Sequence, residues 1–169
     1  IDGGIVIMSR EKIADFNANC AKVMLIGPDP AKPYSGGVAF HMKVLSDLDA
    51  LKDAAIYDPG SMKQMFSFDT LKIIFRCIRL GSKSRSFDHI FINSSIYPSA
   101  FIKLLLIIAG LPSTCKSRIR IFFHGGRFSN IPFLKNRWAA GVARTVLKKV
   151  DSVHFLSKEQ GTGFEEVFP

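Results

Sequence analysis

Short apolar runs alternate with segments of helical periodicity from Lys22 onward. The runs have the length of buried strands and occur at 23–26, 54–57, 90–92, 119–123 and 153–156. Helical patterns lie between them at 37–51, 69–80, 100–109 and about 132–150. This alternation predicts the α/β class: a Rossmann-like, open and mostly parallel sheet with helices on both faces.

The helical pattern over 69–80 is apolar on more than one side. We expect its core face to consist of four apolar residues spaced three or four positions apart along one side of the helix: Leu71, Ile74, Phe75 and Ile78. A narrow basic stripe follows a 4-3-4 spacing and comprises Lys72, Arg76, Arg79 and Lys83. The later helix has a second basic face, which comprises Arg137, Arg144 and Lys148. Such stripes suit either an ordinary solvated face or a helix whose basic side chains reach lipid phosphates.

The composition favours one globular domain in a reducing compartment. A chain of 169 residues buries enough surface for its own core, and none of its apolar runs approaches the roughly 18 residues of a membrane span. No secretory signal is visible. The three cysteines, Cys20, Cys77 and Cys115, are too widely spaced for a disulfide framework or a metal-ligand pair. We therefore expect reduced thiols, a packing role for Cys77 and a cytoplasmic location.

The formal net charge of +9 at pH 7 indicates an anionic partner. Nucleic acid, an acidic membrane surface and a small anionic ligand are all open at this point. No recognised nucleic-acid-binding motif appears, and most of the phenylalanines lie in apolar strand and helix runs rather than beside the basic stripes, so nucleic acid is not expected. The two stripes favour a peripheral position on the inner face of an anionic membrane.

A loop rich in proline and glycine follows the apolar run at 23–26 and ends in Gly36-Gly37, where a helical pattern begins. A helix N-terminus offers unpaired N–H groups and a partial positive charge, and glycine lets a ligand approach the backbone. The loop is therefore either a site for an anionic group such as phosphate or simply a tight turn. It lacks the G-x-G-x-x-G spacing of dinucleotide-binding loops.

Polar side chains follow three of the apolar runs directly. Asn93-Ser94-Ser95 and Tyr97 come after the run at 90–92, His124-Gly125-Gly126-Arg127 after 119–123, and Ser157 after 153–156. The carboxyl ends of parallel strands meet at the edge of the sheet where ligands bind, so these residues predict a polar, hydroxyl-rich ligand beside a phosphate. Structural roles are open for the same side chains, including a helix N-cap for Ser157.

Four stretches, taken in order, resemble the N-terminal half of a family 4 glycosyltransferase of the two-domain GT-B fold. They are K-x-M-x-I-G-P-x-P…P-x-x-G-G-V-x-x-H over 22–41, F-D-H-I-F-I-N-S-S over 87–95, I-F-F-H-G-G over 121–126 and V-D-S-V-H-F-L-S-K-E-Q over 150–160. The resemblance implies transfer of a sugar from a nucleotide-diphosphate donor to a glycan or lipid-linked acceptor, with retention at the anomeric carbon. It also implies that no metal or cofactor takes part, and that the setting is surface polysaccharide biosynthesis.

The resemblance further implies roles for single residues. The backbone N–H groups of Gly36 and Gly37 would contact the donor diphosphate, and His124 would be the catalytic residue beside the transferred sugar. The acceptor side would be formed by Asn93, Ser94, Ser95, Tyr97, Arg127 and Ser157. Arg127 departs from the family pattern, because many relatives have an acidic or small residue at that position.

The resemblance begins at about residue 22. Residues 1–21 are expected to be a leader or an addition foreign to the domain, and residues 22–169 to be the acceptor-side domain. The donor-binding half of the family, with its paired glutamates, would follow Pro169, so the 169 residues alone are expected to catalyse no transfer. The alternative is a non-catalytic Rossmann-like module that binds a nucleotide or a phosphate ligand.

Overall fold

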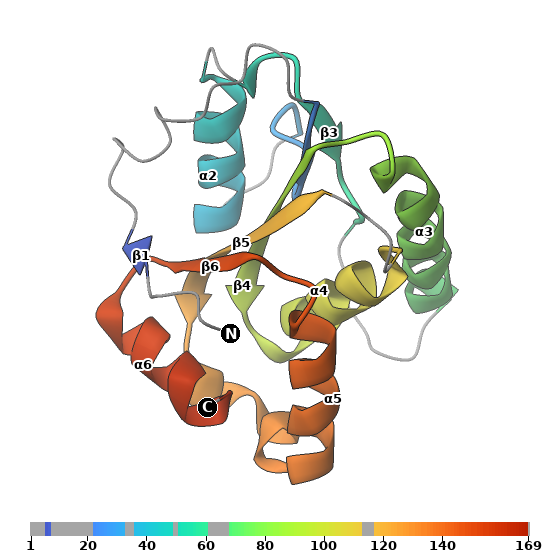
Figure 1. Ribbon diagram of the computed structural model, residues 1–169. Coiled ribbons are helices and arrows are strands. Elements are labelled where there is room, and N and C mark those ends of the chain that lie inside the picture. Colours follow the sequence, from blue (N-terminus) through green and yellow to red (C-terminus); the bar gives the residue numbers. More distant parts are fainter. Residues whose placement is uncertain are drawn as a thin grey trace.

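The computed structural model describes residues 6–7, 22–32, 36–48, 51–60, 68–112 and 117–168. Their strands form one six-stranded sheet in the order β1-β6-β5-β4-β2-β3, and every pairing is parallel (Figure 1). The strands are β1 (Val6–Ile7), β2 (Val23–Ile26), β3 (Ala55–Tyr57), β4 (His89–Ile96), β5 (Arg118–Gly126) and β6 (Ser152–Phe155). The helices are α2 (Gly37–Ser46), α3 (Phe68–Ser84), α4 (Pro98–Gly110), α5 (Arg137–Leu147) and α6 (Lys158–Val167), with short 3₁₀ turns η2 (Phe128–Asn130) and η3 (Pro132–Lys135). The α/β, Rossmann-like class is confirmed.

Alternating side chains of the strands sort the core into two layers, because successive residues of a strand point to opposite faces of the sheet. In β2, Met24 and Ile26 belong to a large cluster that includes buried residues of α3, α4, α5 and α6. Val23 and Leu25 face the other way and pack with Met42 and Leu45 of α2. The sheet therefore has helices on both faces, as the sequence predicted, with four of them on one face and α2 on the other.

The predicted core face of α3 is wrong. Leu71, Phe75 and Ile78 are exposed, whereas Ile73, Cys77 and Leu80 are buried. Both stripes are apolar, so periodicity does not choose between them. Contacts outside the helix fix its rotation: the Tyr57 hydroxyl donates to the Arg76 carbonyl oxygen, and the Arg76 guanidinium donates to the Pro59 carbonyl. The packing role predicted for Cys77 is confirmed.

Several boundaries differ from the predicted ones. Asn93 and His124 were expected in loops, but β4 and β5 continue through them. Asn93 is paired with Phe122 between these two central strands, and His124 directly follows Phe123, which is paired with Ser94. The helix α2 ends at Ser46, five residues earlier than expected, and the pattern over 132–150 divides into η3 and α5. The division falls at Asn136, whose side chain accepts from the Trp138 and Ala139 N–H groups and caps α5.

The first strand lies in the segment that was expected to be a leader or an addition. Most of residues 1–21 are outside the described part of the chain, and the described pair Val6–Ile7 aligns with His154 and Phe155 of β6. Among the described residues, no helix combines the length and the apolar character that crossing a membrane requires.

Candidate functional site

The connections around β2 make the carboxyl ends of β2 and β4 the point where the strand order of the sheet reverses. Strand β2 pairs with β3 on one side and with β4 on the other, and the helices that lead to these neighbours, α2 and α3, belong to opposite faces of the sheet. Ligands of open α/β sheets bind where the strand order reverses in this way. Gly27 follows β2 at this point, and Asn93 lies near the end of β4.

Two histidines and an asparagine meet at this end of the sheet. Nδ1 of His41 in α2 lies 2.6 Å from Oδ1 of Asn93 in β4, and Nε2 of His124 in β5 lies 3.2 Å from the same oxygen. The two imidazole rings are 4.3 Å apart between centroids and tilted by 46°. Two histidines from different elements, far apart in the sequence, thus face one acceptor atom, which a residue of a third element provides.

The orientation of the Asn93 amide fixes the tautomers of both histidines. Its Nδ2 donates to Sδ of Met42 at 3.0 Å, a contact that only the nitrogen can donate, so the oxygen faces the imidazoles. An amide oxygen only accepts, and therefore both ring nitrogens that face it carry a proton. The remaining nitrogens, Nε2 of His41 and Nδ1 of His124, present lone pairs.

Burial keeps the two imidazoles neutral. Desolvation, together with the neighbouring His41, lowers the pKa of His124 to about 4. Desolvation also lowers the pKa of His41, and the hydrogen bond to Asn93 opposes that shift in part. At neutral pH the site therefore offers two uncharged hydrogen-bond acceptors, which can accept from donor groups of a ligand such as hydroxyls.

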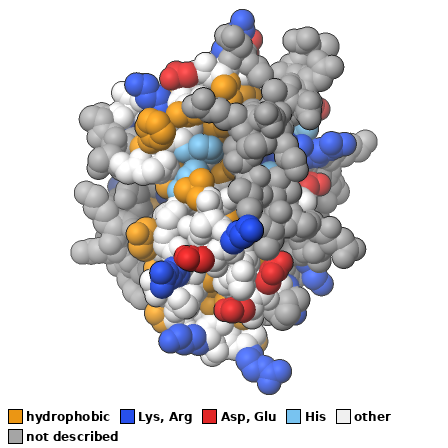
Figure 2. Space-filling view, turned by 90° about the vertical axis from the view of Figure 1, so that its left-hand side faces the viewer, with side chains coloured by type: hydrophobic (Ala, Val, Ile, Leu, Met, Phe, Trp, Pro, Cys, Tyr) orange, Lys and Arg blue, Asp and Glu red, His pale blue; other side chains and the backbone are white. Residues whose placement is uncertain are grey.

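The lone-pair nitrogens have no hydrogen-bond partner within the described part of the chain. One face of the molecule shows histidine side chains at the surface, set among hydrophobic ones (Figure 2). A short distance along that face, basic and acidic side chains gather. The surroundings of the pair are mixed: the Phe122 ring lies 5.6 Å from the His41 ring between centroids, beside the polar Asn93 amide.

The glycine pair at the start of α2 lies on the same helix as His41. Gly36 has φ of +111°, and a methyl group added at either Gly36 or Gly37 would meet no atom within 4 Å. No described side chain caps this helix, and its first turn contains no acidic residue. The N–H groups of the first turn are thus open to an anionic ligand, and His41 follows one turn later. Contact with a diphosphate stays a prediction.

Gly27 lets α2 approach the end of β4. A methyl group on Gly27 would lie 2.7 Å from Sδ of Met42 and 3.3 Å from Cβ of Asn93. Both distances are shorter than ordinary van der Waals contact. The bare α-carbon therefore permits the contact between Met42 and Asn93 that orients the amide.

The other residues predicted for the acceptor side are not all together. Ser94 is buried beside Asn93, with its hydroxyl 3.5 Å from the Ala100 carbonyl, whereas Tyr97 is exposed at the N-cap of α4. Arg127 and Ser157 line a separate cavity of about 700 Å³ at the ends of β5 and β6. The Ser157 hydroxyl accepts from the Gln160 N–H and caps α6, so its predicted N-cap role is confirmed.

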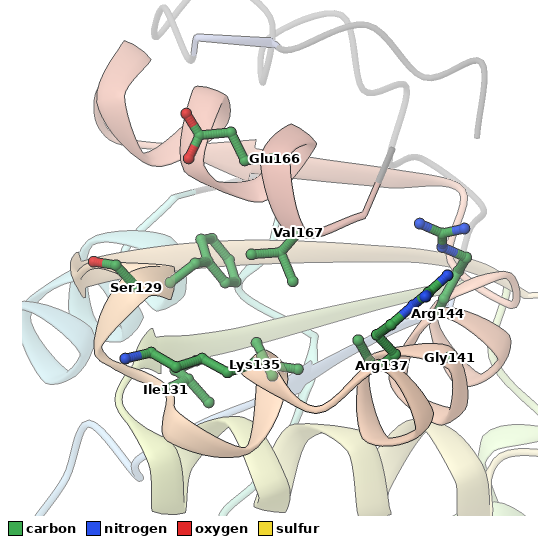
Figure 3. Close-up of a pocket in the computed structure, with 11 residues that line it drawn as sticks. Ser129, Ile131, Lys135, Arg137, Gly141, Arg144, Glu166 and Val167 are labelled. Carbon is green, nitrogen blue, oxygen red and sulfur yellow. The ribbon is translucent and has the colours of Figure 1, made fainter.

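A second cavity of about 740 Å³ adjoins the first and shares Phe128 and Glu166 with it (Figure 3). Its floor is apolar, and its basic side chains come from η3 and α5: Lys135, Arg137 and Arg144. Figure 3 shows Glu166 of α6 on the opposite side of the cavity from Arg137. Of the basic residues predicted to contact a membrane, Arg144 is half-buried here, whereas Arg137, Lys148 and the stripe on α3 are exposed.

Sequence reasoning missed His41 and Gln160. His41 is the last residue of the motif that begins at Lys22, and its place one turn after a glycine helix start could have marked it as facing the ligand. Gln160 is buried; its amide oxygen accepts from the Leu156 N–H, and its nitrogen donates to the Gly126 carbonyl at 3.4 Å. It ties the ends of β5 and β6 together.

Comparisons with known proteins do not identify the chain. No protein-family model matches it, and neither does any curated protein. Among solved structures, the chain is similar to the crystal structure of a candidate flavoprotein from Bacteroides eggerthii, with 11% sequence identity and a TM-score of 0.43. The similar region covers 88% of this chain and 96% of that one. At this TM-score the likeness carries no information about ligand or activity.

Proposed function

We propose that this domain forms the acceptor-side half of a retaining glycosyltransferase active site, which moves a sugar from a nucleotide-diphosphate donor to a glycan or lipid-linked acceptor. The observation that carries the proposal is the cluster of His41, Asn93 and His124 beside the strand-order reversal, in which His41 belongs to the helix that begins at Gly37 after the N-cap Gly36. The resemblance of four ordered sequence stretches to family 4 glycosyltransferases supports it.

The chemistry of the cluster suits this reaction. Transfer of a glycosyl group breaks the bond between the anomeric carbon and the diphosphate oxygen and forms one between that carbon and an acceptor hydroxyl oxygen. The diphosphate leaves with negative charge and can take up the proton that the acceptor hydroxyl loses. The N–H groups at the start of α2 would stabilise that charge. Neutral His124 would accept a hydrogen bond from a sugar hydroxyl through Nδ1 and orient the ring. His41 would hold Asn93 and thereby His124, which makes it a positioning residue.

Binding by the isolated chain tests the proposal. Uniformly ¹⁵N-labelled protein is titrated with pyrophosphate, UDP, GDP, UDP-glucose and GDP-mannose while backbone and imidazole nitrogen signals are recorded. We expect the diphosphate to shift the Gly36 and Gly37 amides and the sugar nucleotides to shift the His124 imidazole in addition. His89, at the opposite end of β4, is the internal reference, and His124→Gln should remove the sugar-dependent shift alone.

Each result decides between the two functions. Shifts at the glycines that are identical with and without the sugar would favour a non-catalytic nucleotide- or phosphate-binding module. If none of the five compounds shifts either region at millimolar concentration, the donor-site proposal is wrong. The isolated chain should show no transfer, because the proposed site supplies only one side of the reaction; turnover by it would contradict the assignment to half a site.

A further inference from the structure

The outer surface of the layer formed by α3, α4 and α5 is apolar to an unusual degree. All three helices contribute buried residues to the same core cluster, and Figure 1 shows α3 and α5 on one side of the sheet with α4 between them. On α3, Leu71, Phe75 and Ile78 are 54%, 70% and 60% exposed. They lie on consecutive turns, so they form one continuous row that faces away from the core.

The helix α5 repeats this arrangement. Trp138 is 78% exposed and Val142, one turn later, is 45% exposed. The buried residues of α5, Ala143 and Leu147, lie on the opposite side of the helix. Between α3 and α5, the partly buried Ile102, Leu105 and Leu106 of α4 continue the apolar character of the layer. Exposed apolar residues so grouped on one face mark an interaction surface.

The charges of the same three helices are almost all positive. Their sequences contain seven lysines and arginines and one acidic residue, Asp69. The exposed cations of α3 lie along one side of the apolar row: Lys72, Arg76, Arg79 and Lys83. On α5, Arg137 flanks Trp138, and Lys148 follows the helix. The surface thus combines an apolar centre with a basic border.

We propose that this face docks on an anionic phospholipid bilayer, with α3 and α5 lying parallel to the membrane plane. Phe75 and Trp138 enter the boundary between head groups and acyl chains, and the flanking basic side chains reach lipid phosphates. Aromatic and aliphatic side chains within a cationic border match the two zones of an anionic bilayer, whereas nucleic acid would use the charges and leave the aliphatic row in water. The inference is independent of the glycosyltransferase proposal.

Vesicle flotation tests the proposal with the full chain. The probes are vesicles of phosphatidylcholine alone and vesicles with 30 mol per cent phosphatidylglycerol, at about 0.1 M salt, where surface charges still interact. We expect at least tenfold more bound protein on the anionic vesicles. Both Phe75→Ser/Trp138→Ser and Lys72→Glu/Lys83→Glu should reduce binding about tenfold, and blue-shifted Trp138 fluorescence should accompany binding, since Trp138 is the chain's single tryptophan.

Matched changes on α2 provide the control. Phe40 is exposed and Lys43 is exposed, so Phe40→Ser/Lys43→Glu changes the same residue types on the other face of the sheet. This variant should bind like the unchanged protein. Equal, weak binding to both vesicle types would overturn the proposal. So would an oligomer in solution that Phe75→Ser/Trp138→Ser dissociates, because the face would then be a contact between proteins. Circular dichroism of each variant confirms that it is folded.

Discussion

The rings of His41 and His124 lie 4.3 Å apart between centroids and both face the amide oxygen of Asn93, so neither imidazole can gain a proton without affecting the other. A proton on one ring would place its charge against a neighbour that burial also keeps neutral. The pair is therefore held in one protonation state, and its properties can be tested apart from any ligand.

The stability of the protein should fall on acidification between pH 6.5 and pH 4. His124 has a pKa of about 4 in the folded protein against 6.5 in the unfolded chain, so in this window the unfolded state binds more protons. The free energy of unfolding then decreases by about 3 kcal/mol as the pH drops, and His41 acts in the same direction. Urea titrations at several pH values measure this. His124→Phe should flatten the curve, and an unchanged slope in that variant would refute the assignment.

A carboxylate at position 93 should raise the pKa values of both histidines. Asn93→Asp keeps the acceptor for both histidines and adds a negative charge, which favours the imidazolium form and raises both pKa values. The shift can be followed by NMR titration of the histidine signals. Asn93→Leu is the control, since it removes the acceptor and introduces no charge. If Asn93→Asp leaves the His124 titration unchanged, the two side chains are not in contact.

Adjacent glycines at the end of β5 should differ sharply in their tolerance of alanine. Both have positive φ, +62° at Gly125 and +84° at Gly126, but only Gly126 is confined: its added methyl would lie 2.3 Å from the Ile96 carbonyl oxygen. Gly125→Ala should cost about 1 kcal/mol of stability through backbone strain alone. Gly126→Ala should cost at least about 2 kcal/mol more, because β4 and β5 must separate. Urea unfolding of both variants makes the comparison; equal losses would contradict it.

The rotation of α3 can be tested with one pair of isoleucines. Ile73 is buried, so Ile73→Ala should destabilise the protein by about 2–4 kcal/mol. Ile78 is exposed, and Ile78→Ala should change stability by less than about 0.5 kcal/mol. Thermal and urea unfolding of the two variants give the difference directly. The opposite order would restore the core face that the sequence pattern suggests.

The sequence predicts the strands better than it predicts which residues surround the site. A buried parallel strand reads as a plain apolar run, and β2 is found at the predicted residues. The polar ends of β4 and β5 were expected in loops, because ladder pairing with a neighbouring strand is invisible in a single segment. The face of α3 was mistaken for a related reason: two apolar stripes compete, and contacts from Tyr57 and Pro59 decide between them.

The histidine pair is a second case in which a single segment of sequence does not show which residues meet in the fold. His124 follows an apolar run and could be proposed from the sequence, whereas His41 lies within a helix and is 83 residues away in the chain. Both rings face Asn93, which lies in β4, a third element of the chain. Only the sheet order brings the three together. Residue type and local pattern could suggest Asn93 and His124, but they could not suggest His41 or the contact among the three.

The bare α-carbon at Gly27 has a consequence for how such a domain can diverge. Because Met42 of α2 packs directly over Gly27 and against Asn93, the packing of α2 on its face of the sheet determines the distance between His41 and His124. The contacts of Met42 with Gly27 and Asn93 involve no residue of the loop between Gly27 and Gly36. Its length and composition are therefore an independent variable: the loop can be remodelled for a different anionic group while the neutral histidine pair keeps its geometry.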